Sequence, residues 1–391
     1  IGYFAGRNVT TAAANVIIGG LAGDALTTGG DNVAIGYGAL SSEDEHGANV
    51  AVGYLALQDQ DAGANAYNTA VGFGAGKEVS TGIQNTLIGG SAGDALTTGN
   101  YNVAVGVYAL SSEDEHGYNV AIGRQCLSTL NAGADAYNVA IGYYAGQAMS
   151  TGTHNTIMGG QAGDAITTGF GNVAIGHAAL STEDAGDRSV GIGYFALNAQ
   201  NVSGGGNAYN VAVGYGAGEV VSTGIRNTIM GGLAGDALTT GSWNVAIGHA
   251  ALSTEDGHGS STAIGYRALQ SQNAGAESYN VAVGFDTGRL VSTGTANVLV
   301  GGMAGDALTT GEKNIAIGTN ALGVEDEHGR NVAIGHQTLE NQNAGADAYN
   351  VAIGFEAGND VTTGVSNTLV GGVAGDALTT GSNNVAIGYA A

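Results

Sequence analysis

The chain contains no proline, a single cysteine, few basic residues and no long apolar run. Because proline cannot donate a backbone hydrogen bond, its absence from 391 residues predicts that nearly every backbone N–H is bonded. One cysteine excludes a framework of intrachain disulfides. The 9 basic and 33 acidic residues give a net charge of −24, which argues against nucleic acid and an anionic membrane as partners. Without an apolar run of roughly 18 residues, we expect no membrane insertion of this segment.

Glycine is present in excess, at 72 residues, but without the Gly-X-Y period of collagen. Instead, the motif Asn-Val-Ala-Ile-Gly, as in residues 32–36, recurs with variations 22 times, at steps of 17, 19 or 21 residues. One copy has too few apolar side chains to fold alone, whereas stacked copies share a core. The sequence therefore predicts an all-β parallel β-solenoid of about 23 coils of 17–21 residues, continuous over residues 1–391. We expect it to be a section of a longer fibre.

The five columns of the motif have separate predicted roles. Position 1 is Asn in most copies, and we expect its side-chain amides to stack in a ladder. Position 5 is always Gly, which predicts a corner where a positive φ or a close backbone excludes a Cβ. Positions 2 and 4 are β-branched or aliphatic, and we expect them to face the core, so that position 3 faces outward. The structural candidates in these columns are Asn32, Gly36, Asn119, Gly123, Asn331 and Gly335.

Four coil types, A to D, alternate in a 70-residue super-repeat, with example coils that start at Asn68, Asn85, Asn102 and Asn119. In type-B coils position 3 is Leu or Ile, whereas other coils have Ala or Gly there. Two interpretations are open: local compensation of volume, or contact with another chain at every fourth coil. The second makes the type-B leucines candidates for self-association: Leu87, Leu299 and Leu369.

The turns of type-C coils carry clusters of acids. Close carboxylates offer the oxygen ligands that Ca²⁺ takes, although they also suit a solvated turn that prevents lateral aggregation. The candidate calcium ligands are Glu43, Asp44, Glu45, Glu113, Asp114, Glu115, Glu325, Asp326 and Glu327. No other cofactor is indicated. Cys126 occupies column 8, which is otherwise Ala or Thr, and this predicts a small buried filler, not a nucleophile.

Residues 119–123 (Asn-Val-Ala-Ile-Gly) and their copies resemble the head repeats of trimeric autotransporter adhesins, the YadA-like left-handed parallel β-roll, and related repeats of phage tail fibres. The resemblance extends over essentially the whole chain. It implies a left-handed coil, a homotrimer, and an extracellular location on a cell surface, in a filament or in a virion fibre.

Pattern and resemblance together favour a structural or adhesive extracellular fibre that assembles with itself, as a trimer or filament, for attachment or display. We expect no enzymatic activity, and a cell-surface or glycan receptor is a further candidate partner. One alternative is a secreted ice-binding or calcium-binding solenoid, although the Thr27–Thr28 type of pair returns only at every fourth coil. Another is a glycan-cleaving phage spike, which would need a paired-carboxylate cleft, whereas the acids here repeat along the chain.

Overall fold

The computed structural model describes residues 1–202 and 204–391, which form short parallel strands and no helix. The chain divides into two compact units, Ile1–Ser189 with Asn201–Asn207, and Val190–Gln200 with Ala208–Ala391. The strands of the first unit are β1 (Val16–Ile18), β2 (Val33–Ile35), β3 (Val50–Val52), β4 (Thr69–Val71), β5 (Thr86–Ile88), β6 (Val103–Val105), β7 (Val120–Ile122), β8 (Val139–Ile141), β9 (Thr156–Met158) and β10 (Val173–Ile175). Those of the second are β11 (Val190–Ile192), β12 (Val211–Val213), β13 (Thr228–Met230), β14 (Val245–Ile247), β15 (Thr262–Ile264), β16 (Val281–Val283), β17 (Val298–Val300), β18 (Ile315–Ile317), β19 (Val332–Ile334), β20 (Val351–Ile353), β21 (Thr368–Val370) and β22 (Val385–Ile387).

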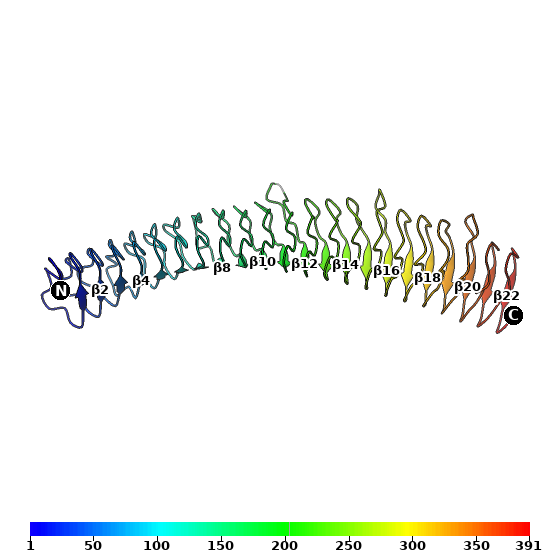
Figure 1. Cartoon of the computed structure of the whole chain (residues 1–391), viewed down its shortest axis with the longest axis horizontal. Coiled ribbons are helices and arrows are strands. Elements are labelled where there is room, and N and C mark those ends of the chain that lie inside the picture. Colours follow the sequence, from blue (N-terminus) through cyan, green and yellow to red (C-terminus); the bar gives the residue numbers. More distant parts are fainter. Residues whose placement is uncertain (203) are drawn as a thin grey trace. The chain divides into compact units, whose positions relative to one another are not determined.

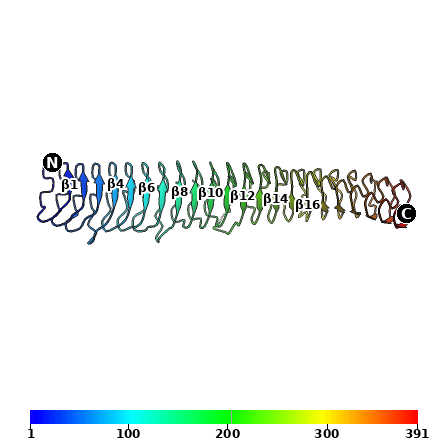
Figure 2. The same cartoon turned by 90° about the horizontal axis from the view of Figure 1, so that it is seen from below.

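Each coil has its strand on one side and its polar turn on the other (Figure 1). Within each unit every strand pairs in parallel with the next, and the strands lie side by side (Figure 2). The register places equivalent motif positions opposite one another, as in the pair Ala104 and Ala121. The predicted parallel β-solenoid with a 17-residue coil is confirmed.

Backbone N–H groups in and next to each strand donate hydrogen bonds to the preceding and the following coil. The N–H of Val120 donates to the carbonyl of Asn138 in the following coil, at 2.9 Å. The N–H of Gly123 donates to the carbonyl of Val105 in the preceding coil, at 2.8 Å. A proline at either position would remove a bond between coils, which accounts for the lack of proline.

The Asn column forms the expected ladder, mainly by side chain to backbone bonds. Asn119 is fully buried, and its N–H donates to Asn102 Oδ1 at 3.0 Å, while its own Oδ1 accepts the N–H of Asn138 at 3.2 Å. The Nδ2 of Asn138 donates to the carbonyl of Gly152 at 2.8 Å. Each amide thus satisfies a buried N–H of the next coil through Oδ1 and a carbonyl of its own coil through Nδ2. The same Oδ1 bond is made by Asn32 and Asn331.

The Gly corner is confirmed on both physical grounds. Gly123 has φ 137°, and a Cβ there would overlap the carbonyl of Gly142 in the next coil. A side chain is therefore excluded by conformation and by space at once. Equivalent conflicts meet a Cβ at Gly36 and Gly335.

The predicted orientation of the strands is wrong. In β2–β21 the middle residue, position 3, is buried, whereas the outer two residues are half-buried or exposed. Ala121 is fully buried, for example, while the neighbouring Ile122 is 36% exposed. The reason is the narrow coil: Ala109 and Leu110, at positions 8 and 9 of a type-C coil, are also fully buried and leave little room inside.

The type-B leucines are correspondingly core residues, and their predicted contact with another chain is wrong. Leu87 is fully buried. A Cβ on Gly76 would lie 2.5 Å from Leu87 Cδ1, and one on Gly93 2.8 Å from Cδ2. These glycines hold position 9 of the type-A and type-B coils, where type-C and type-D coils have Leu. The leucine at position 3 fills this space, as the volume interpretation expects. Fully buried with it are Leu299 and Leu369.

Candidate functional site

The outward sides of the strands form an apolar surface in each unit. We call the first and third residues of β1–β22 the outer strand face. In the described strands the third residue is Ile, Val or Met, the first is Val, Ile or Thr, and none is charged. In-register stacking places like side chains against one another, so each covers part of the next. Those that stay exposed include Val71 (37%), Ile88 (38%) and Met158 (38%). Apolar side chains exposed singly are ordinary, whereas contiguous exposed apolar patches are typical of interaction sites in general.

Aromatic rings at position 6 stack from coil to coil. Tyr37 and Tyr54 have centroids 5.6 Å apart, and Tyr54 and Phe73 5.0 Å, with nearly parallel planes. The following type-B coil has Gly90 there, which ends the stack. Because the ring faces cover one another, the ring edges reach solvent. His336 stacks on a ring in the same way, at 5.4 Å, so this histidine has a packing role.

The acidic turns are less solvated than expected, because their first Glu is buried. Glu113 is fully buried, and its Oε1 accepts the N–H of His116 at 3.2 Å. Its Oε2 accepts the N–H of Ala132 in the next coil at 3.3 Å, so one carboxylate joins two turns. Burial raises the pKa of Glu113, against the lowering effect of these hydrogen bonds. Equally buried, with a pKa raised by the same cause, are Glu43 and Glu325.

The sequence contained a signal for this burial that was missed. Glu occupies this column in all five type-C turns. Two positions further on, Glu115 corresponds to Ala185 and Gly257 in other copies. An acid that never varies beside one that does indicates a specific partner, here the backbone of two turns.

The structure brings together only part of the candidate calcium set, and adds histidine. The third acid of each turn is exposed and lies outside the clusters: Glu45, Glu115 and Glu327. The remaining Glu and Asp lie near a His, with one ligand atom from each residue within 4.8 Å of the others. The clusters among the described residues are Glu43, Asp44 and His46; Glu113, Asp114 and His116; Glu255, Asp256 and His258; and Glu325, Asp326 and His328.

Serine and threonine hydroxyls join coils in type A and type B. Ser80 Oγ donates to the carbonyl of Thr97 at 3.1 Å, and Thr97 Oγ1 donates to the carbonyl of Asp114 at 2.9 Å. An ice-binding face would instead turn its hydroxyls to solvent.

Cys126 is a buried filler, as predicted. Its Sγ donates to the carbonyl of Ala140 at 3.1 Å, and burial raises the pKa of the thiol to about 12. A thiol with so high a pKa is almost wholly protonated near neutral pH, which makes it a poor nucleophile.

No protein-family model matches the chain, and no curated protein matches it. The described residues form no pocket. They also contain no helix with the length and hydropathy that crossing a bilayer requires.

Proposed function

We propose that this chain is a structural fibre protein that assembles with copies of itself through the outer strand face. The observation that supports the proposal most strongly is the apolar, uncharged character of that face at strand after strand. Core packing of the single coil does not account for it, because the coil's own interior is filled by positions 3, 8 and 9.

A second copy of the chain is the occupant that fits the face best. Strands in a stack recur at roughly 4.8 Å, and a partner must offer apolar groups at the same interval. Another copy laid parallel does so at every coil. The net charge of −24 opposes close approach of two chains, but the outer strand face itself contains no charge. Association through it should therefore strengthen as salt screens the remaining acids.

Three copies around a common axis, an extracellular location and a role in attachment or display complete the proposal, in line with the resemblance to adhesin heads and tail fibres. The receptor belongs to the class of cell-surface groups or glycans. No catalytic role is assigned.

The test is sedimentation equilibrium on the whole chain at micromolar concentration. Wild type should associate, and a variant with Ile88→Asp, Val105→Asp and Ile122→Asp should be monomeric with its β circular dichroism kept. The control adds the same charge at three exposed turn residues, Ser42→Asp, Thr182→Asp and Thr254→Asp, and should still associate. A monomeric wild type, or association of the triple variant, would contradict the proposal.

A further inference from the structure

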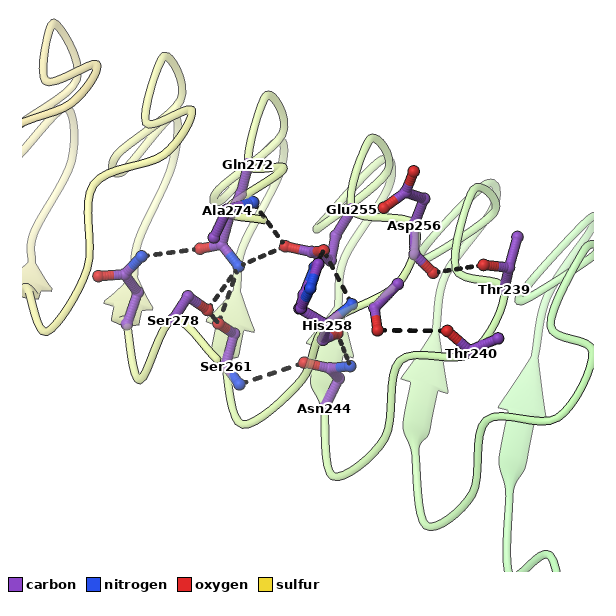
Figure 3. Close-up of polar contacts among 12 residues, drawn as sticks. Thr239, Thr240, Asn244, Glu255, Asp256, His258, Ser261, Gln272, Ala274 and Ser278 are labelled. Atoms are coloured by element: carbon purple, nitrogen blue, oxygen red, sulfur yellow. Dashed lines mark hydrogen bonds and ion pairs between the residues drawn. The ribbon is translucent and has the colours of Figure 1, made fainter. Parts of the chain in front are cut away.

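Four type-C turns combine a buried Glu, an Asp and a His in one cluster. Figure 3 shows the turn that contains Glu255. The His258 ring lies beside the Glu255 carboxylate, and the Asp256 side chain projects from the same turn. Glu255 is fixed by its surroundings, since its Oε1 accepts the N–H of His258 at 3.1 Å and its Oε2 accepts from Gln272 Nε2 at 3.2 Å. The cluster is therefore built into the stack of coils.

Polar atoms in these turns are buried without hydrogen-bond partners. In all four turns the His Nδ1 is such an atom, and in three of them it faces the Glu Oε1 at 3.6–3.7 Å, too far for a good hydrogen bond. In two turns the fully buried carboxylate also has an unpartnered Oε2, on Glu43 and on Glu325. Unpaired buried acceptors are costly, and a cation among them would satisfy several at once.

The donor set selects the class of cation. Imidazole and carboxylate together suit zinc and neighbouring divalent transition metals, whereas Ca²⁺ takes oxygen ligands. With bonds of roughly 2.0–2.2 Å in a tetrahedron, zinc ligand atoms lie about 3.4 Å apart. The distance of 3.6–3.7 Å between Nδ1 and Oε1 is close to this value. Water can complete the coordination, because the His side chains are 25–33% exposed.

We propose that each of these four turns binds one divalent transition-metal ion of the zinc class through the Glu carboxylate, the Asp carboxylate and His Nδ1. The ion fastens a turn to the coil stack, because the same Glu already bonds the following coil, as Glu113 does to Ala132. This inference is independent of self-association, since the ions are counted per chain.

The chain contains its own control in the remaining type-C turn, the third along the sequence. There Glu183 and Asp184 are followed by Ala185 and Gly186, so the position of His is taken by Gly. Glu183 is fully buried and accepts the N–H of Gly186 at 2.7 Å, as the other turns do with His. The carboxylates are present without the imidazole, and we expect this turn to bind no ion.

The experiment counts zinc on the full chain, first stripped with a chelator, then dialysed against micromolar zinc chloride and analysed by elemental mass spectrometry and titration calorimetry. Wild type should bind four ions, His116→Gln three, and the variant with all four turn histidines changed to Gln none. His249→Gln, in the ring column at position 6, should still bind four. Calcium chloride should give no stoichiometric binding.

The sharpest test is a variant that should gain a metal site. Gly186→His should raise the count to five, since Gly186 has no positive φ. An added Cβ would lie 2.6 Å from the Glu183 carboxylate, so this side chain has to shift to admit the histidine. Circular dichroism checks that each variant stays folded. Five ions on wild type, none on wild type, an unchanged count in His116→Gln, or calcium bound in place of zinc would each overturn the proposal.

Discussion

The two faces of the same three-residue strand obey different rules. On the inner face, residue size varies with coil type, from Ala104 to Leu87, and both are fully buried. The large residue lies against glycine, since a Cβ on Gly93 would be 2.8 Å from Leu87 Cδ2, whereas the coil that contains Ala104 has Leu110 at position 9. On the outer face the residues stay β-branched or aliphatic in every coil type. The inner face is thus explained by the coil's own volume, which leaves the constant character of the outer face to the proposed contact between copies.

The largest expected effect comes from emptying the inner face. Leu87→Ala should destabilise its coils by about 2–5 kcal/mol, because a fully buried leucine leaves a cavity between two glycines. Ile88→Ala, next to it on the outer face, should have less than half that effect when the chain is dilute. Hydrogen exchange of the β4–β6 amides measures both, since stability in a repeat array is local. Equal losses of stability in the two variants would contradict the distinction between the inner and the outer face.

The corner that ends each strand should come next. Gly123→Val places a Cβ into the backbone of the next coil at a positive φ, and should destabilise by on the order of 1–3 kcal/mol. The control is Gly133→Val, in a turn where φ is also positive, at 68°, but nothing lies within 4 Å of the added Cβ. The midpoint of urea unfolding should fall further for Gly123→Val. Similar midpoints would mean that conformation alone, and not the close approach of coils, selects glycine.

A smaller effect concerns acids that lie on neither strand face. Burial raises the pKa of half-buried aspartates in type-B coils, among them Asp164 and Asp236. A raised pKa means that the folded chain binds the proton more tightly. These groups therefore favour folding most below the ordinary pKa of Asp, about 3.8, and this contribution declines as pH rises through the folded value. Asp164→Asn with Asp236→Asn should flatten the dependence of the unfolding midpoint between pH 4 and 6, roughly the range above the ordinary pKa. A steeper dependence would contradict the sign.

The smallest effect is expected at the chain's one thiol, which lies in the core outside the strands. Cys126→Ala should leave unfolding and assembly unchanged, because the column is Ala in most coils. In the folded wild type the thiol should resist a disulfide reagent at pH 8 and react only after denaturation, as its burial and its pKa of about 12 require. Rapid labelling of the folded chain would contradict the filler role.

The solenoid could be predicted because the motif repeats along the whole chain. The Asn ladder and the Gly corner could be predicted because each depends on one column of the motif, in which a single property of the residue decides the structure. The orientation of the strand could not, because an alternation of period two fits either face when both faces are apolar. The facing of the strand is indicated only by the pairing of a large residue, Leu87, with a small one, Gly76. These two residues lie in different coils, so a single copy of the motif does not show the pairing. The burial of Glu113 was missed because its partners are backbone groups, so that only the constancy of its column among the five turns signals them.

The outer strand face can be tested most directly by single-cysteine crosslinking on the Cys126→Ala background. Ile122→Cys places one thiol on that face, and Glu115→Cys places one on an exposed turn of the neighbouring coil. If copies meet through their strands, mild oxidation at micromolar concentration should join Ile122→Cys chains in high yield and leave Glu115→Cys chains largely single. Efficient crosslinking through Glu115→Cys, with none through Ile122→Cys, would place the interface on the turns and contradict the account.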